Sequence, residues 1–308
     1  MDRVICNIVF TKNRPLQLEG YLRSLYRYFS PELIETSVIY KKELFSKEYD
    51  SVFGQYKDVR VIVEDDFHRD VMSVIESAKT EYILFGIDDV VFFDGVDFGL
   101  IDRAFKKAGE EIFGFTLRFD PASLENGPDE IQAEQIDGQT VYKLDWTKGQ
   151  TAHTRYPFEL CCTFYRTDLV KKILAGTMSS SPAAKRFFGP DSAIVKFLPV
   201  RKWRRSLLKR FGFFFSPNTL ESWPCRWSQR NAEKLPRFTH FQRICASAVQ
   251  VNMVNTSTAN TIDGTEEHTV EALNEKFKQG YRLDIEYIAR HKPSRPGCGK
   301  DYFKLAKM

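Results

Sequence analysis

The chain has 308 residues, of which 43% are apolar and 28% are charged, and its formal net charge is +4. This composition is that of a globular protein and excludes an intrinsically disordered chain. The length allows one large domain or two small ones with a full hydrophobic core. No apolar run approaches the roughly 20 residues that a transmembrane helix needs.

The first residues and the cysteines indicate the compartment. The start of the chain, MDRVICNIVF, has an acid at position 2, a short apolar run and no small-residue cleavage site, which argues against a signal peptide. The six cysteines form no CxxC pair and no zinc-binding pattern, and the adjacent Cys161 and Cys162 have poor geometry for a mutual disulfide. We therefore predict reduced thiols and a cytoplasmic protein.

Strands and helices alternate through the first hundred residues. Strands are predicted at 4–10, 35–42, 59–64 and 81–87. Helices are predicted after Pro15 and after Asp66, with apolar residues at helical spacing. This alternation predicts an α/β fold with a Rossmann-like, mostly parallel sheet and helices on both faces. Ligands bind such sheets beyond the carboxyl ends of the strands, so the residues that follow each strand form the candidate site.

Two adjacent carboxylates, Asp88 and Asp89, interrupt the apolar segment YILFGIDDVVFF at the end of the fourth predicted strand. Burial of two neighbouring like charges is costly unless a cation or hydrogen-bond donors compensate. The pair suits a hard divalent cation such as Mg²⁺ or Mn²⁺, which also bridges phosphate oxygens. The alternative is a turn in which the aspartates cap a helix or bond backbone amides.

The segment TKNRP joins the first predicted strand to the first predicted helix. Thr11 and Asn13 are good helix caps and Pro15 suits the first turn, so a helix start alone would account for these residues. A helix start is also an anion site, because its free amides point at whatever lies there. Arg14 adds a side chain that can bind phosphate in a bidentate manner.

Together, VICNIVFTKNRPLQLEGYLRSL and YILFGIDDVVFF resemble the nucleotide-sugar half of a family 2-like GT-A glycosyltransferase. The resemblance covers residues 1–95. It implies an enzyme that moves a sugar from a nucleotide-diphosphate sugar to a glycan or a lipid-linked acceptor. It also implies a bound Mn²⁺ or Mg²⁺.

The resemblance assigns roles to the residues of both motifs. It implies that Thr11, Asn13 and Arg14 hold the nucleotide. It places Asp89 on the metal with the donor diphosphate, and Asp88 in the metal site near the ribose. The acidic motif of the family is often a spaced DxD, whereas the two aspartates are adjacent here.

Family members usually also carry an aspartate that reads the base. Here the second predicted strand ends in Tyr40-Lys41, so the candidates are Asp65 and Asp66 after the third strand. A solvated loop is the alternative for at least one of the acids at 64–66.

The second half of the chain should supply the acceptor site. We predict a strand at 111–119, a loop or hairpin at 120–139, a strand followed by a helix at 156–174, a late strand at 246–256 and a late helix at 269–284. We expect residues 1–95 to form the nucleotide-sugar-binding half and 96–290 the acceptor-binding half of one GT-A domain. Residues 291–308 are expected to form a C-terminal tail.

Three carboxylates in the second half are candidates for the general base that deprotonates the acceptor hydroxyl: Asp191, Glu221 and Glu159. Asp191 lies at a predicted helix start, where an ordinary cap is the alternative. Glu221 is flanked by a Pro-Asn turn and a tryptophan, and aromatic faces suit sugar rings. The resemblance also implies that a histidine can complete the metal shell; the candidates are His153, His240 and His268, none of them preferred, and a surface position is the alternative for each.

A basic segment, RKWRRSLLKRFGFFF, covers residues 201–215. Positions 201–210 hold six Lys or Arg and no acid, and without them the net charge would be −2 (4 − 6). Apolar residues share one helical face, so the segment has the pattern of an interfacial helix on an anionic membrane surface. This would place the enzyme at the inner face of the membrane. A basic helix packed on the core is the alternative, and no nucleic-acid-binding module is present.

Two other function classes remain open. A nucleotidyltransferase on a related sheet would usually open with a glycine-rich loop, and VFTKNRP contains no glycine. A non-catalytic, membrane-associated protein with a degenerate sugar-nucleotide site would keep the motifs without turnover. Metal-dependent binding of a nucleoside diphosphate, followed by its release during turnover, distinguishes the three classes.

Overall fold

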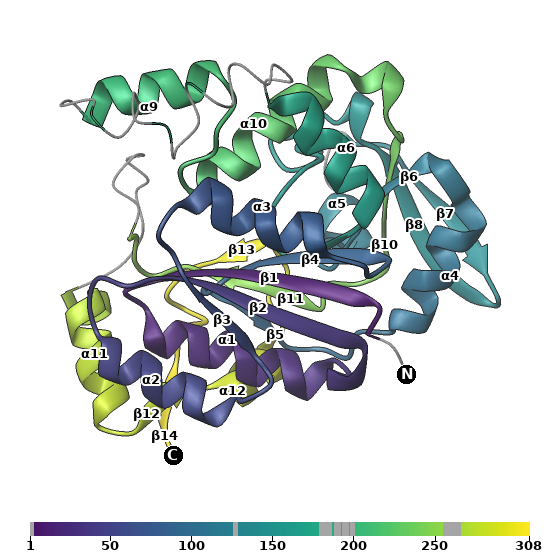
Figure 1. Cartoon of the computed structure of the whole chain (residues 1–308). Helices are drawn as coiled ribbons and strands as arrows, with labels where there is room; N and C mark the ends of the chain where they lie inside the picture. Colours follow the sequence, from purple (N-terminus) through teal and green to yellow (C-terminus); the bar gives the residue numbers. More distant parts are fainter. Residues whose placement is uncertain are drawn as a thin grey trace.

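The computed structural model describes residues 3–125, 129–178, 187, 192, 197, 201–254 and 266–308. A nine-stranded sheet runs through the molecule in the order β3-β2-β1-β4-β9-β6-β10-β8-β7, with helices on both faces (Figure 1). The predicted α/β fold with a covered sheet is therefore confirmed.

The first half of the sheet is parallel. Its strands are β1 (Ile5–Lys12), β2 (Ile34–Lys41), β3 (Arg60–Val63) and β4 (Tyr82–Ile87). The connecting helices are α1 (Pro15–Tyr28), α2 (Ser46–Gln55) and α3 (Phe67–Ser77). Helices α1 and α2 cover one face and α3 covers the other (Figure 1). Most side chains of β1, β2 and β4 are consequently buried, as expected for a parallel sheet with both faces covered.

The second half of the sheet is mixed. Strand β9 (Thr163–Arg166) lies antiparallel between β4 and β6 (Ile112–Thr116), and β10 (Phe238–Phe241) is parallel to β6. The edge is an antiparallel hairpin of β7 (Ile131–Ile136) and β8 (Gln139–Asp145). Its turn residues, Asp137 and Gly138, both have positive φ, at 47° and 80°. Such a turn matches the twist of paired strands, so the hairpin that the sequence offered as one possibility is present.

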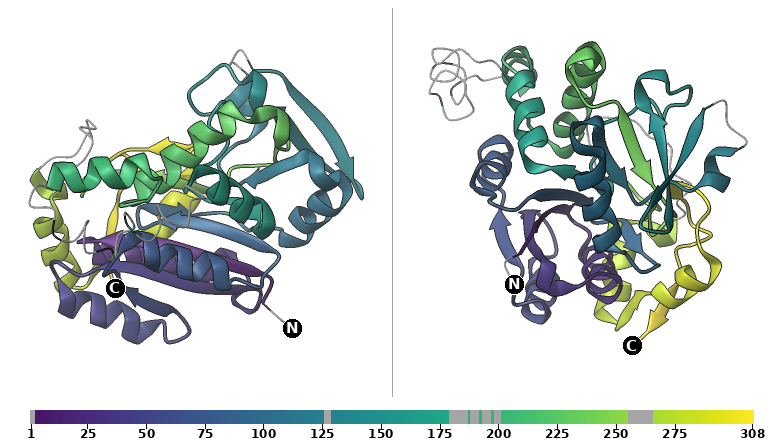
Figure 2. Two further views of the ribbon diagram at one scale, coloured as in Figure 1. Left: turned by 45° about the horizontal axis from the view of Figure 1, so that its top comes forward. Right: turned by 90° about the vertical axis from the view of Figure 1, so that its right-hand side faces the viewer.

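Helices cover this half as well. They are α4 (Phe98–Ala108), α5 (Pro121–Glu125), α6 (Thr167–Thr177) and α10 (Pro217–Arg230). Helix α9 (Arg201–Arg210) lies apart from them, above α3 in Figure 1. Figure 2 shows α6, α9 and α10 on the same side of the sheet as α3. The predicted strand before α6 is shorter than expected, because Cys162 has a φ of 61° and turns the chain immediately before β9.

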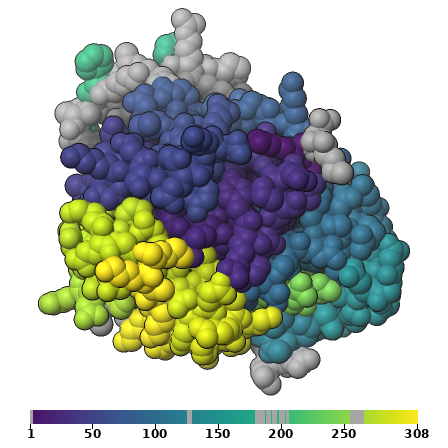
Figure 3. Space-filling view, turned by 90° about the horizontal axis from the view of Figure 1, so that it is seen from below, coloured from purple at the N-terminus to yellow at the C-terminus, as the bar shows by residue number. Residues whose placement is uncertain are grey.

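The last part of the chain wraps back onto the first helix. It comprises β11 (Ala246–Val249), α11 (Val270–Lys278), β12 (Tyr281–Leu283), α12 (Ile285–His291), β13 (Gly297–Cys298) and β14 (Leu305–Lys307). Strand β11 pairs with both β5 (Val90–Phe92) and β13, and β12 pairs with β14. Residues 291–308, which the sequence suggested as a tail, thus contribute two paired strands. Figure 3 shows this C-terminal region packed beside the N-terminal one.

Candidate functional site

The carboxyl ends of β1 and β4 bring the two predicted motifs together. These strands are neighbours, with Phe10 in register with Ile87, so the residues after each strand meet at one edge of the sheet. The Thr11 hydroxyl donates to Asp88 Oδ2 at 2.8 Å, and the backbone amide of Lys12 lies 3.4 Å from the same oxygen. Asp88 and Asp89 are both buried.

Arg14 lies between the two carboxylates. Its Nη1 donates to Asp89 Oδ2 at 3.0 Å, and its Nη2 forms an ion pair with Asp88 Oδ1. Burial lowers the pKa of Arg14, but the charges of Asp88 and Asp89 outweigh this effect and raise it above its ordinary value. The guanidinium is therefore one of the compensating groups that two buried acids require.

The carboxyl group of Asp88 holds its proton more tightly than an exposed aspartate does. Burial raises the pKa of Asp88 from 3.8 to about 6, against the opposing charge of Arg14 and with a further rise from Asp89. One guanidinium cannot neutralise two carboxylates, so ionisation of both leaves one excess negative charge at this edge of the sheet.

The surroundings of Asp89 fit a divalent cation. Asp89 Oδ1 is buried and has no hydrogen-bond partner among the described residues, and oxygen is the ligand that Mg²⁺ and Mn²⁺ prefer. Within the same described ranges, no group of three or more His, Cys, Asp or Glu side chains is arranged to hold a metal. Asp88 and Asp89 would therefore need further ligands from a bound molecule or from water.

Tyr49 of α2 supports the first motif, and the sequence alone did not single it out. Its buried hydroxyl lies 2.7 Å from the Thr11 hydroxyl and accepts the backbone N–H of Arg14 at 2.8 Å. Helix α1 begins at Pro15 without a side-chain cap, so Tyr49 satisfies a backbone donor next to the helix start. Tyr49 thereby fixes the backbone that carries Arg14.

Asn13 takes a structural position in the same turn. Its φ is 53°, in the left-handed region where asparagine is favoured over most residues. Its Oδ1 accepts the backbone N–H of Leu44 at 3.0 Å, and its Nδ2 donates to Glu43 at 3.4 Å. Asn13 therefore joins the turn after β1 to the loop after β2.

Asp65 and Asp66 lie at the start of α3. Asp66 caps the helix by accepting the backbone N–H of Arg69 at 2.9 Å, and Asp65 pairs with the guanidinium of Arg69 at 2.8 Å. The Asp65 side chain is 85% exposed. Strand β3 is the third strand from β4, so these acids lie farther along the sheet edge than Thr11 does.

Asn252, which the sequence analysis did not single out, connects the motif to the C-terminal region. Its backbone oxygen lies 3.4 Å from Arg14 Nη1, and its Oδ1 accepts from Gln17 at 3.3 Å. Its Nδ2 donates to the backbone oxygen of His268 at 2.8 Å. The chain after β11 is thus held against the start of α1, next to Asp88 and Asp89.

Two of the predicted base candidates lie close to one another in the second half. Glu159 is buried, pairs with Arg118 and accepts from the Thr163 hydroxyl. Glu221, in the first part of α10, accepts the backbone N–H of Leu160 at 3.2 Å. Burial raises the pKa of Glu221, while the Leu160 amide and the charge of Arg118 oppose the rise.

Cys161 follows Leu160, whose backbone N–H binds Glu221. Burial raises the pKa of the Cys161 thiol, Arg118 opposes the rise, and the charges of Glu221 and Asp89 add to it. The third candidate, Asp191, lies outside the described residues.

The histidines do not converge on the carboxylates. His240 is buried on β10, with its Nε2 3.3 Å from Glu134 at the hairpin edge. Burial lowers the pKa of His153, and the charge of Arg118 lowers it further. His268 contributes the backbone oxygen that Asn252 binds.

The basic segment forms helix α9 and a following loop. Trp203 is 59% exposed, whereas Leu208, Phe213 and Phe214 are buried. The backbone N–H of Phe214 donates to His68 Nδ1 at 3.2 Å, so part of the predicted apolar face packs inside the fold. None of the helices in the described ranges has the length and apolar character of a membrane span.

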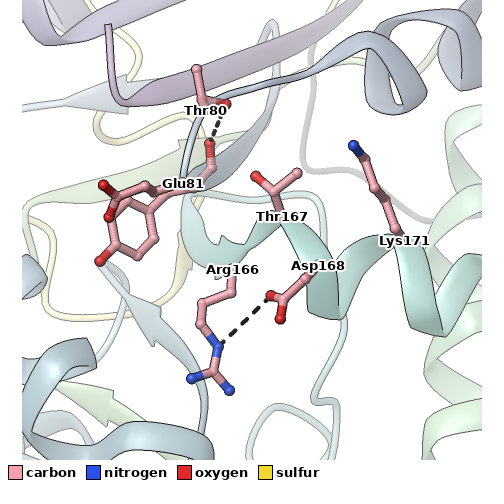
Figure 4. A pocket seen from close by; sticks show the side chains of 7 residues that line it. Thr80, Glu81, Arg166, Thr167, Asp168 and Lys171 are labelled. Carbon is pink, nitrogen blue, oxygen red and sulfur yellow. Dashed lines mark hydrogen bonds and ion pairs between the residues drawn. The ribbon is translucent and has the colours of Figure 1, made fainter. Parts of the chain in front are cut away.

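A cavity of about 440 Å³ lies at the opposite end of β4 (Figure 4). Two of its basic lining groups are engaged: Lys171 donates to the backbone oxygens of Glu76 and Ala78, and Arg166 lies 3.9 Å from Asp168. Because ligands of parallel sheets bind beyond the carboxyl ends, we do not assign the function to this cavity.

Comparisons with known proteins agree with the predicted resemblance. No protein-family model matches the chain. The chain is 22% identical over 196 residues to the bifunctional glycosyltransferase pgtA of Dictyostelium discoideum, a match that covers 56% of this chain and 25% of the relative. The chain therefore spans about a quarter of the length of that curated relative. This similarity confirms the predicted resemblance to glycosyltransferases.

Two solved structures match parts of the chain. S. aureus TarS in complex with UDP is matched with a TM-score of 0.38 and 16% identity, over 55% of this chain and 48% of that chain. The mannosyltransferase PcManGT from Pyrobaculum calidifontis, in complex with GDP-Man and Mn²⁺, is matched with a TM-score of 0.32 and 14% identity, over 41% of this chain and 39% of that chain.

Proposed function

We propose that the chain is a GT-A-type glycosyltransferase that moves a sugar from a nucleotide-diphosphate sugar to a glycan or lipid-linked acceptor. The observation that carries the proposal is the cluster of Arg14, Asp88 and Asp89 at the carboxyl ends of β1 and β4. The sequence similarity to a curated glycosyltransferase supports it independently.

The donor diphosphate would bind at the start of α1. Arg14, which pairs with Asp88 and Asp89 in the structure, would turn its N–H donors to the diphosphate, and the free amides of the first helical turn would favour the same negative group. The departing nucleoside diphosphate carries the charge that develops when the sugar bond breaks, so these donors would stabilise the transition state. Thr11 and Asn13 would support the nucleotide from the same turn, and Asp65 or Asp66 would face the base.

Asp89 and Asp88 would hold Mn²⁺ or Mg²⁺. When bound, such an ion supplies positive charge that stabilises the leaving diphosphate. Asp88 would in addition accept hydrogen bonds from ribose or sugar hydroxyls through its buried carboxylate.

Glu221 is the favoured general base. A base at neutral pH needs a raised pKa, and burial raises the pKa of Glu221. The carboxylate of Glu159 is instead engaged by Arg118 and Thr163, which suits a role in fixing the loop before β9. In this mechanism Glu221 takes the proton from the acceptor hydroxyl, whose oxygen then attacks the sugar. Asp191 remains the third candidate.

The basic segment would bring the enzyme to its acceptor. Helix α9 and the following residues would dock on an anionic membrane at its cytoplasmic face, with Trp203 as an exposed aromatic anchor. A lipid-linked acceptor would then be presented at the same surface.

Turnover assays with a panel of nucleotide sugars that includes UDP and GDP derivatives test the proposal. A glycosyltransferase releases a nucleoside diphosphate and transfers the sugar to a glycan or lipid-linked acceptor. A nucleotidyltransferase releases pyrophosphate, and a protein with a degenerate site binds without release. Absence of nucleoside diphosphate release with every donor, in the presence of Mn²⁺ and candidate acceptors, would refute the proposed activity.

A further inference from the structure

Arg14 engages both carboxylates of the candidate metal site at once. Its side chain is only 10% exposed, and its two terminal nitrogens reach Asp88 and Asp89 separately. Nη1 also lies 3.4 Å from the backbone oxygen of Asn252. The guanidinium therefore stands where a cation is needed to neutralise the acidic pair.

A divalent cation that enters this arrangement alone meets two obstacles. The buried Asp89 Oδ1 offers it a ligand, but Arg14 holds Oδ2 of the same carboxylate, so two positive charges would lie close together. Hard cations also take about six oxygen ligands, and the described residues supply no cluster of three metal-binding side chains. The protein by itself is thus a poor site for a free ion.

A diphosphate removes both obstacles. Its oxygens supply the missing ligands for the ion, and they offer Arg14 a doubly charged partner in exchange for Asp89. We propose that Arg14 couples the binding of the divalent cation to the binding of the diphosphate. Without a nucleotide, its guanidinium pairs with Asp88 and Asp89. When a nucleoside diphosphate binds, the guanidinium pairs with it in exchange for Asp89, so the cation and the diphosphate bind cooperatively. This inference rests on the proposed function, because it assumes that the diphosphate binds at the start of α1.

Coupling of this kind is reciprocal. If the diphosphate increases the affinity for Mn²⁺ by a certain factor, Mn²⁺ must increase the affinity for the diphosphate by the same factor. Loss of the Arg14 charge should strengthen binding of Mn²⁺ alone and weaken binding of the diphosphate. A residue that only supported the fold would not move these two affinities in opposite directions.

The test is a titration of Mn²⁺ into the purified full chain, followed by calorimetry and by the electron paramagnetic resonance signal of free Mn²⁺. Each titration is carried out without nucleotide and with UDP or GDP present. Arg14→Met removes the charge and keeps a side chain of similar length. Arg23→Met is the matched control, because Arg23 lies on the same helix and also pairs with a carboxylate, Glu19.

In the wild-type protein we expect a nucleoside diphosphate to increase the Mn²⁺ affinity roughly tenfold or more. Arg14→Met should bind Mn²⁺ alone roughly tenfold more tightly than the wild type and should lose most of the coupling. Arg23→Met should behave as the wild type does. If Arg14→Met does not fold, Arg14→Gln gives the same comparison, since its neutral amide removes the charge and keeps a hydrogen-bond donor.

Two failures are distinguishable. Wild-type protein that binds neither UDP nor GDP, with or without Mn²⁺, would refute the proposed function and this inference with it. Wild-type protein that binds Mn²⁺ equally well with and without a bound nucleotide, or an Arg14→Met protein that keeps the wild-type coupling, would overturn the role of Arg14 alone.

Discussion

The hydroxyl of Thr11 donates to the carboxylate of Asp88 at 2.8 Å and so joins the ends of β1 and β4. The same hydroxyl lies 2.7 Å from that of Tyr49, which holds the backbone of Arg14. Both motifs of the candidate site depend on this one buried contact. Its loss should therefore affect the stability of the fold and the affinity for nucleotide together.

Thr11→Val tests this contact. The variant keeps the shape of the side chain but removes one hydrogen bond from Asp88 and one from Tyr49, and loss of hydrogen bonds between buried groups costs about 1–3 kcal/mol. We expect a lower free energy of unfolding in a denaturant titration and weaker nucleotide binding in calorimetry. Thr36→Val is the control, because Thr36 is also buried and bonded, to Asn7, on the neighbouring strand. A control variant that lost as much nucleotide affinity would contradict this account.

Asp89→Asn should abolish metal-dependent turnover and leave the fold intact. The amide keeps the size of the side chain and its acceptor oxygen for Arg14, but it removes the negative charge that a divalent cation requires. Release of nucleoside diphosphate measures the activity, and circular dichroism measures the fold. Asp102→Asn, on the surface of α4 beside Lys106, serves as control. Full activity of the Asp89 variant, or of the wild type in excess chelator, would exclude the metal role.

Arg14→Ala should weaken binding of a nucleoside diphosphate by about 1.5–3 kcal/mol, the usual scale for a hydrogen bond to a charged group. Calorimetric titration with UDP and GDP at saturating Mn²⁺ gives the difference. An unchanged dissociation constant would place the nucleotide elsewhere on the protein.

The pH dependence of turnover tests Glu221. Because burial raises the pKa of Glu221, kcat/KM should rise with pH along a limb whose apparent pKa lies above the ordinary value of 4.5. Glu221→Gln should remove this limb, whereas Glu159→Gln should keep its position. The same limb in both variants would assign the base to another group, with Asp191 next to be examined.

The stability of the fold should also depend on the protonation of Glu221. The contribution of Glu221 to stability should fall as the pH rises, whereas kcat/KM should rise. A carboxyl whose pKa is raised on folding binds its proton more tightly in the native state than in the unfolded chain. Its contribution to stability is complete below the ordinary pKa and is lost as the pH rises through the raised value. The difference in unfolding free energy between the wild type and Glu221→Gln should therefore change over that interval. A difference that stays constant with pH would contradict the raised pKa.

Membrane docking is tested by co-sedimentation with vesicles. Each exposed basic residue near an anionic surface contributes about 1 kcal/mol, and salt screens this attraction. The variant changes four residues of the basic segment to glutamine: Arg201, Lys202, Arg204 and Arg205. The matched control changes four lysines elsewhere: Lys106, Lys107, Lys143 and Lys148. Equal sedimentation of the two variants with anionic vesicles, at low salt, would refute a docking role for 201–215.

Local sequence patterns, such as apolar strands and turn residues, predicted part of the site. The strand before Thr11 and the strand before Asp88 are mostly apolar runs, and parallel sheets gather the ends of such strands at one edge. The hairpin turn at Asp137 and Gly138 is equally local, since its residue types favour positive φ.

The other contacts of the site depend on tertiary structure. Tyr49 lies 38 positions from Thr11, and Asn252 lies 238 from Arg14, so no spacing in the sequence reveals these pairs. The pairing of Arg14 with both aspartates was missed for the same reason. The sequence showed a helix start and an acidic pair, but it did not show that one would neutralise the other.

The most direct measurement is a crystal structure of the protein soaked with UDP or GDP sugars and Mn²⁺. The account predicts an anomalous manganese peak bonded to Asp89, and a diphosphate between that peak and the start of α1 with Arg14 turned towards it. A nucleotide bound instead in the cavity beside Arg166 and Lys171, or a manganese peak away from Asp88 and Asp89, would contradict the assignment of the site.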